Sequence, residues 1–266
     1  MSTAHDWEER AGGGGQGDPR IVRTGDVLMA EWPGIGRLTC NLRTSTSRFA
    51  AERGADPTLV AKLRAGAVPA LLGDLRGGLS LHASAVATRS GAVLFMGAGG
   101  AGKSTAALEL CLNHGGRLLS DDMTSLTFEG STAFVVPTER AHHLTSASFR
   151  LLGLGPPTTR KKQKVPLRAR RARSPAPVAL IAMLSPDGRR SRPTLRRLSG
   201  VEAVRMLLPS IVRFDVHARR ARELDQVLAL YGQCPVLHVS RPTRTSARSL
   251  VGGVVIRTLE EGLPWV

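Results

Sequence analysis

The chain has 266 residues, of which 42% are hydrophobic and 22% are charged, and its formal net charge is +16. This length and balance fit a soluble globular protein with a full core. No apolar run approaches the roughly 18 residues that a membrane-spanning helix needs. Residues 1–20 are polar and glycine-rich and lack the apolar region of a signal peptide, so we expect a disordered tail and a cytoplasmic protein.

The positive charge is concentrated in two runs, residues 158–174 and 187–197. Such runs favour polyanionic partners, which could be nucleic acid, an anionic membrane or an acidic peptide, although arginine-rich solvated loops give the same pattern. The runs contain no aromatic residues for base stacking, which weakens the nucleic-acid interpretation. Cys40, Cys111 and Cys234 lack CxxC spacing and are odd in number, which argues against a disulfide framework or a zinc site.

The first part of the chain predicts mainly strands. Residues 20–43 indicate two or three strands with tight turns. Residues 56–76 contain helical stretches, since Asp56 is a good N-cap and Pro57 suits the first helical position. Residues 79–88 and 91–97 read as two strands joined by a turn.

The central part predicts a strand, a helix and further strands. Residues 104–114 favour a helix that ends at a pair of glycines, and residues 117–120 form a short buried strand. Residues 123–137 read as a hairpin that turns at Glu129-Gly130. The basic, proline-rich stretch 155–177 has no periodicity, and we expect a long mobile loop that acts as a lid or a binding segment.

The last part predicts a buried strand over 177–184, a helix with capping-box spacing between Ser199 and Glu202, and a final strand over 235–240. An amphipathic helix is expected over residues 217–232. Its predicted apolar face consists of Ala221, Leu224, Val227, Leu228 and Tyr231. The order of elements predicts an α/β fold with a mixed sheet. We expect a single domain over residues 21–266, with leading strands and helices in 21–90 and a nucleotide-binding core in 91–137.

The strongest motif is "GAGGAGKS", which matches the phosphate-binding loop (P-loop) pattern G-x-x-x-x-G-K-[ST] at every fixed position. Its members are Gly97, Ala98, Gly99, Gly100, Ala101, Gly102, Lys103 and Ser104, followed by Thr105 in the predicted helix. Backbone N–H groups of such a loop bind phosphate oxygens at a helix N-terminus. Lys103 would reach the β- and γ-phosphates of ATP, and the Ser104 hydroxyl would ligate Mg²⁺.

Two adjacent carboxylates, Asp121 and Asp122, follow Lys103 after eighteen positions. The predicted helix carries the chain about 16 Å away from the phosphates, and the next strand returns it by about 16 Å. The carboxylates should therefore lie at the mouth of the phosphate loop. One can ligate Mg²⁺, and the other can accept a proton from an attacking hydroxyl.

These segments resemble the HPr kinase/phosphorylase family, whose catalytic domain is related to phosphoenolpyruvate carboxykinase. The resemblance rests on "LHASAV" before the loop, on the loop itself, on "LLSDD" after its helix, and on "PVALIAML" followed by "LSGVEAVRMLL". It spans roughly residues 20–256. The additional N-terminal domain of HPr kinase and its Glu-x-Arg-Gly-x-Gly signature are not found. The chain is thus more similar to shorter relatives that phosphorylate serine hydroxyls, including those on precursor peptides of lasso peptides.

The resemblance implies a role for individual residues. Asp121 takes the position of the base that activates a serine hydroxyl, Asp122 lies beside the metal, and His82 lies near the phosphates, although a lone histidine on a strand also suits a structural role. Glu139 and Arg140 could add a metal or phosphate contact. The implied activity is ATP-dependent transfer of the γ-phosphoryl group to a serine-type hydroxyl of a peptide or small protein. The resemblance also implies assembly into a homo-oligomer.

Two other functions remain open at this stage. A small-molecule kinase of the same fold would use the same residues. A nucleic-acid-associated ATPase would use the basic runs, but the chain lacks an ABC signature and a later Walker B strand with a catalytic glutamate.

Overall fold

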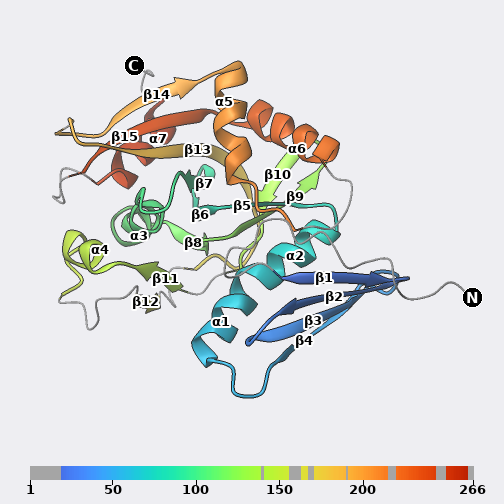
Figure 1. The fold of residues 1–266 in the computed structure, drawn as a ribbon. Helices are drawn as coiled ribbons and strands as arrows, with labels where there is room; N and C mark the ends of the chain where they lie inside the picture. The colour runs from blue at the N-terminus through green and yellow to red at the C-terminus, as the bar shows by residue number, and fades with distance from the viewer. Residues whose placement is uncertain are drawn as a thin grey trace, which may run out of the picture. The chain divides into compact units, whose positions relative to one another are not determined.

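The computed structural model describes residues 19–138, 141–155, 163–166, 171–189, 191–214, 220–243 and 250–262 (Figure 1). Its internal contacts divide the chain into two compact units, the first reaching Ala61 and the second beginning at Lys62. The sequence predicts a single domain over residues 21–266. None of the helices in these ranges combines the length and the apolar character that crossing a bilayer requires.

The first unit is a four-stranded antiparallel sheet in the order β1-β2-β3-β4. Its strands are β1 (Arg20–Thr24), β2 (Val27–Trp32), β3 (Gly36–Asn41) and β4 (Thr46–Ala51). Alternate residues of β2 and β3 are buried, as expected for a sheet with one covered face. The predicted two or three strands before residue 43 are present.

Two short helices follow the first sheet. The carboxylate of Asp56 accepts a hydrogen bond from the backbone N–H of Thr58 at 2.7 Å and so caps α1 (Pro57–Ala65), as the sequence predicts. After Gly66 the chain continues as α2 (Ala67–Leu75).

The second unit is built on a sheet of nine strands among the described residues. A separate two-stranded sheet comes between the sixth and seventh of these strands in the sequence. The nine strands are β5 (Leu79–Leu81), β6 (Ala83–Thr88), β7 (Gly91–Met96), β8 (Arg117–Ser120), β9 (Thr124–Glu129), β10 (Thr132–Val135), β13 (Ala176–Asp187), β14 (Thr194–Leu198) and β15 (Val236–Pro242). The path runs β5-β9-β10-β13-β7-β6-β8, and β15 pairs with both β13 and β14.

The long strand β13 organises this sheet. It is parallel to β7 and to β15, whereas β6 runs antiparallel to β7. The sheet is therefore mixed, and the fold is a mixed α/β fold as predicted. The carboxyl ends of β7, β13 and β15 meet at one edge, which is where ligands bind in such sheets.

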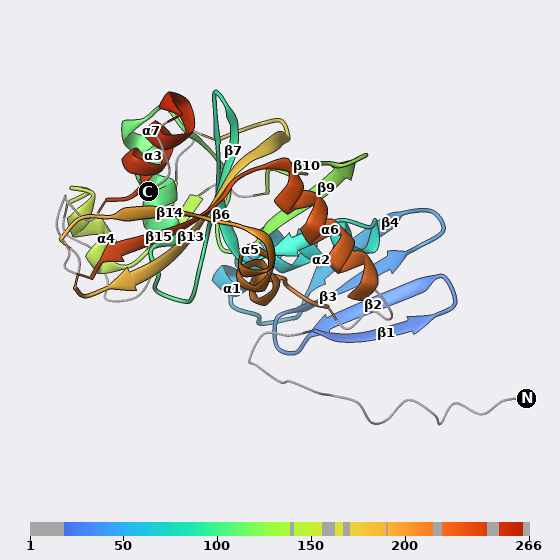
Figure 2. The ribbon, with the colours of Figure 1, turned by 90° about the horizontal axis from the view of Figure 1, so that it is seen from above.

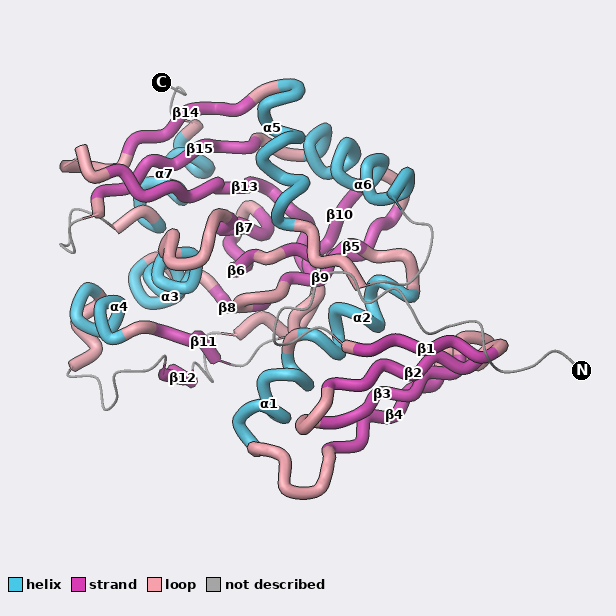
Figure 3. Tube along the Cα trace, in the orientation of Figure 1, coloured by secondary structure: helices cyan, strands magenta, loops and turns pink. Residues whose placement is uncertain are grey.

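Helices cover both faces of this sheet (Figures 2 and 3). One core cluster packs α5 (Gly200–Leu207), the 3₁₀ turn η2 (Leu208–Ser210) and α6 (Arg220–Gln233) against the sheet. The other packs α3 (Lys103–Asn113), α4 (Ser146–Leu151) and α7 (Gly252–Glu261) against the opposite face. Phe95, Met96 and Leu94 of β7 are fully buried between these layers.

Three details of the sequence analysis are corrected by the structure. Ser199 precedes α5 but its side chain makes no capping bond, and the Glu202 carboxylate pairs with Arg196 at 2.6 Å. Within the stretch 155–177, which was expected to be a loop, Gln163–Pro166 forms β12 and pairs with β11 (Ala141–Leu144).

The third correction concerns α6. Val227 and Leu230 are fully buried, whereas Leu224 and Leu228, which were assigned to the apolar face, are 43% and 47% exposed. The side of the helix that faces the sheet is therefore rotated from the predicted one.

This rotation predicts unequal costs for the same substitution at neighbouring positions of α6. Leu230→Ala should lower the free energy of unfolding by about 2–5 kcal/mol, because it leaves a cavity in a closed core. Leu228→Ala should change it by about 0.5 kcal/mol or less, because the side chain is largely in water. Urea denaturation of the two variants checks this, and equal losses would contradict the observed packing.

Candidate active site

The P-loop lies between β7 and α3, as the sequence predicts. Gly97, Gly100 and Gly102 have positive φ angles of 133°, 80° and 100°, which residues with side chains rarely adopt. A Cβ on Gly97 would collide with the carbonyl of Leu184 at the end of β13, whereas Gly99 and Gly100 face open space. The loop is thus closely packed on one side and open on the side where phosphates would bind.

Lys103 is the first residue of α3 and lies over this loop. Its Nζ donates to the carbonyl oxygens of Gly97 at 2.8 Å and of Ala98 at 3.2 Å. These carbonyls hold the ammonium group at the loop, where triphosphate oxygens could replace them as stronger, charged acceptors.

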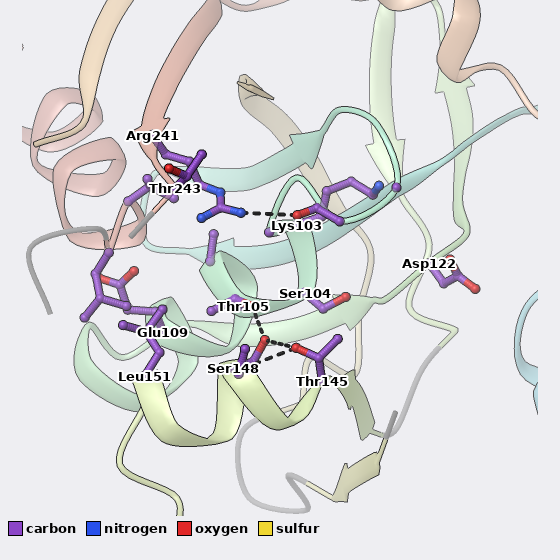
Figure 4. Close-up of a pocket in the computed structure, with 17 residues that line it drawn as sticks. Lys103, Ser104, Thr105, Glu109, Asp122, Thr145, Ser148, Leu151, Arg241 and Thr243 are labelled. Atoms are coloured by element: carbon purple, nitrogen blue, oxygen red, sulfur yellow. Dashed lines mark hydrogen bonds between the residues drawn. The ribbon is translucent and has the colours of Figure 1, made fainter. Parts of the chain in front are cut away.

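A cavity of about 260 Å³ opens beside the loop (Figure 4). The predicted site residues that line it are Gly99, Gly100, Gly102, Lys103, Ser104, Thr105 and Asp122. The remaining lining residues, which were not predicted, are Ala106, Glu109, Thr145, Ala147, Ser148, Leu151, Arg241, Thr243, Leu250 and Val251. The structure therefore places one of the two aspartates in the same cavity as the lysine and the serine of the loop.

The helix α4 is attached to the loop helix by hydroxyl groups. The Ser148 Oγ lies 2.7 Å from the Oγ1 of Thr105 and 3.0 Å from that of Thr145. Thr145 also caps α4 by accepting from the backbone N–H of Ser148. This cluster fixes one wall of the cavity, with Leu151 on the same helix (Figure 4).

A buried carboxylate ties α3 to α7. Glu109 is only 3% exposed, and its two oxygens accept from the backbone N–H groups of Gly252 at 2.7 Å and Gly253 at 2.9 Å. The positive end of the helix dipole of α7 thus stabilises this charge. A Cβ on Gly252 would lie 2.9 Å from the carboxylate, so the glycine allows the close approach.

Arg241 reaches the P-loop from β15. Its Nε donates to the carbonyl of Ala101 at 2.6 Å, and its Nη2 donates to that of Gly100 at 3.2 Å (Figure 4). Partial burial lowers the pKa of the guanidinium, which nevertheless stays charged in proteins. The sequence analysis missed this residue, although the signal was available, since Arg241 ends a strand that runs parallel to β13 and thus finishes at the P-loop edge.

The two aspartates differ in their surroundings. Asp121 is fully buried and accepts a 2.6 Å hydrogen bond from the Ser84 hydroxyl on β6. Asp122 is 43% exposed, and its Oδ2 lies 3.3 Å from the Nζ of Lys62 on α1. Its φ of 81° is unusual for a residue with a side chain and is typical of strained turns at functional sites. Asp122 lines the cavity, whereas Asp121 is buried and is not among the lining residues.

The other predicted residues lie outside this cavity or outside the described ranges. His82 lies between β5 and β6 with an exposed side chain, its backbone N–H donates to Ser210, and it is not among the residues that line the cavity. Gly97, Ala98 and Ala101 shape the loop without lining the cavity. Glu139 and Arg140, and most of the basic run 158–174, lie outside the described residues.

The oxygen groups of the cavity fit a magnesium ion. Within the described ranges, no cluster of three or more His, Cys, Asp or Glu could hold a metal by itself. Mg²⁺ does not require one, because it usually binds one or two protein oxygens together with waters and substrate phosphates. Ser104 and Asp122 would supply such oxygens.

Comparison with known proteins gives a distant likeness in fold. No protein-family model matches the chain, and no curated protein matches it significantly. Among solved structures, the HPr(Ser) kinase/phosphatase from Coxiella burnetii aligns with 69% of this chain and 94% of its own length, at 16% identity and a TM-score of 0.36. The geometry of the cavity, and not this likeness, supports the function proposed below.

The position of Arg241 predicts a loss of nucleotide affinity when it is removed. Arg241→Ala should weaken binding of Mg-ATP about tenfold, or about 1.4 kcal/mol, because a charge and two contacts to the loop carbonyls are lost together. Titration calorimetry measures the effect, with the exposed Arg189→Ala as a control that should bind like the wild type. Unchanged affinity in Arg241→Ala would show that the guanidinium only packs against the loop.

Proposed function

We propose that this chain is an ATP-dependent kinase that transfers the γ-phosphoryl group to a serine-type hydroxyl of a peptide or small protein. The observation that carries the proposal is the cavity that Lys103, Ser104 and Asp122 line together, with Asp121 adjacent in the chain. A nucleotide switch requires only the phosphate loop with Lys103 and Ser104. A pair of carboxylates beside the phosphate loop suits a hydroxyl acceptor.

Phosphate binding would be the task of the loop and of two cations. Lys103 would exchange its bonds to Gly97 and Ala98 for the β- and γ-phosphates, and Arg241 would add positive charge at the same loop. A magnesium ion bound at Ser104 and Asp122 would neutralise the charge that develops on the phosphates. Asp122 would give up its ion pair with Lys62 when it takes this role.

Asp121 is the proposed base. Its Oδ1 is held by Ser84, which orients the carboxylate, and the adjoining strained turn at Asp122 is the part of the chain that must move for an acceptor hydroxyl to reach it. Contacts of this kind often tighten only when both substrates are bound. The base would then take the hydroxyl proton as the oxygen attacks the γ-phosphorus, the bond from that phosphorus to the bridging oxygen would break, and ADP would leave.

The central experiment is incubation of the protein with Mg-ATP and candidate acceptors, read by the intact mass of every product. A gain of one phosphoryl group on a peptide or protein supports the proposal. Phosphorylation of a metabolite alone would indicate a small-molecule kinase. ATP hydrolysis that depends on nucleic acid, without transfer, would indicate an ATPase.

Replacing the base predicts a selective loss of transfer. Asp121→Asn keeps the size of the side chain and a hydrogen-bonding partner for Ser84 but cannot take a proton, so the transfer rate should fall by about 10²–10⁴-fold. The affinity for Mg-ATP, measured by calorimetry, should stay within about twofold. Normal transfer by this variant would mean that Asp121 is not the base.

Asp122→Asn should act through magnesium instead. Loss of one charged oxygen ligand weakens the ion's site, so the Mg²⁺ concentration for half-maximal transfer should rise severalfold while the rate at saturating Mg²⁺ recovers in part. A magnesium titration of the transfer rate measures this. As a control, Asp26→Asn at an exposed position of the first sheet should leave the titration unchanged, and an unshifted curve for Asp122→Asn would exclude the metal role.

A further inference from the structure

A second cavity, which we call the β9 groove, is lined by residues of the strand that follows Asp121 and Asp122 in the chain. It encloses about 610 Å³ and is formed by α2, β9, the chain that follows β10, and α6. These elements are visible together in Figures 1 and 2. None of the residues that line the P-loop cavity lines this groove, so the two are separate sites.

The length of the groove suits an extended chain. Its lining residues on β9 run from Ser125 to Phe128, with Gly130 just beyond the end of the strand. At about 3.3 Å per residue in a strand, this distance is about 16 Å. Some five residues of extended peptide would fill it, whereas a small metabolite would occupy only part of it.

One end of the groove adjoins the proposed base. Ser125 comes three residues after Asp122, and Thr138, on the groove wall, donates from its backbone N–H to the carbonyl of Leu119 at 2.9 Å. Leu119 is two residues before Asp121. A chain lying in the groove can therefore continue to the turn where the two aspartates lie.

The charge of the groove favours an acidic occupant. Arg76 and Arg222 are exposed and line the groove, and within the described part of the chain no ion pair involves either of them. Arg222 lies against Gly77, whose φ of 88° and lack of a side chain admit the guanidinium, since a Cβ there would collide with it. Asp225 is the one carboxylate in the lining, so the groove carries an excess of positive charge.

We propose that the β9 groove binds an extended, acidic segment of the peptide acceptor and delivers its serine to Asp121. This inference rests on the proposed kinase function for the delivery step alone. Apolar side chains such as Leu72 and Phe128 would contact the alternate residues of the segment, and the two arginines would bind its carboxylates.

The test uses a fluorescein-labelled peptide, Asp-Leu-Asp-Ser-Asp-Leu-Asp, and the same peptide with Asn in place of each Asp. Fluorescence anisotropy, in the absence of ATP, gives the affinity of each for the full chain. The wild type should bind the acidic peptide at least tenfold more tightly. The double variant Arg76→Glu with Arg222→Glu should lose that preference and at least tenfold in affinity.

The matched control separates the groove from the general positive charge. Arg117→Glu with Arg205→Glu changes the net charge equally at exposed positions outside the groove, and it should stay within twofold of the wild type. Thr127→Trp, which fills the groove without changing charge, should weaken binding as the arginine variants do. Mg-ATP affinity should be normal in all three, which shows that they are folded.

Each outcome decides the matter. Equal binding of the two peptides, equal losses in both double variants, or no effect of Thr127→Trp would overturn the groove assignment. Groove-dependent binding without transfer from Mg-ATP to any serine acceptor would refute the kinase function and leave the acidic-peptide site in place. Transfer to peptides at the same rate in the wild type and in the groove variants would support the kinase function and refute the groove assignment.

Discussion

The site depends on the parallel arrangement of β7, β13 and β15. Because β13 pairs with both neighbours in the same direction, the carboxyl ends of all three strands meet at one edge. That edge holds the P-loop after β7, the Leu184 carbonyl that Gly97 packs against, and Arg241 at the end of β15. An antiparallel β15 would have put the arginine at the far end of the sheet.

Charged side chains hold the loop through hydrogen bonds to its neutral backbone carbonyl groups. Two cations, Lys103 and Arg241, bond to four successive or nearby carbonyls of the loop, from Gly97 to Ala101. The same loop carries the backbone N–H groups of Gly99 and Gly100, residues at which an added Cβ would meet no atom within 4 Å. Anionic oxygens of a ligand could accept hydrogen bonds from the two cations and from these N–H groups. They would replace the neutral carbonyl oxygens as acceptors for the cations, and the backbone would need to move little.

Local patterns made much of this fold predictable. Spacing along a short stretch of chain predicts the strand–loop–helix over residues 91–113 and the return to Asp121. A short stretch allows few alternative chain paths. The position of His82 shows the limit, because a one-residue break between β5 and β6 leaves its side chain exposed. Arg241 and Glu109 act across more than a hundred residues, and only strand order and direction bring such groups to the loop.

The orientation of α6 was misjudged for a related physical reason. Its sequence offers leucines on more than one side, and periodicity alone cannot tell which side the sheet covers. In the structure, Gln233 at the end of the helix bonds to Ala133 of β10 and Val178 of β13, and Gln226 bonds to Gly77. Polar side chains that satisfy backbone groups of the sheet thus help to set the rotation of the helix, and a hydrophobicity pattern does not contain them.

The hydrogen bonds between Glu109 and α7 link that helix to the wall of the cavity beside the P-loop. The carboxylate is shielded from water, and the N–H groups of Gly252 and Gly253 compensate its charge. A chain that ended before residue 250 would leave this charge uncompensated in the helix that begins with Lys103, which is a costly arrangement. The helix α7 therefore supports one wall of the cavity beside the P-loop, and its removal would disturb that wall through α3.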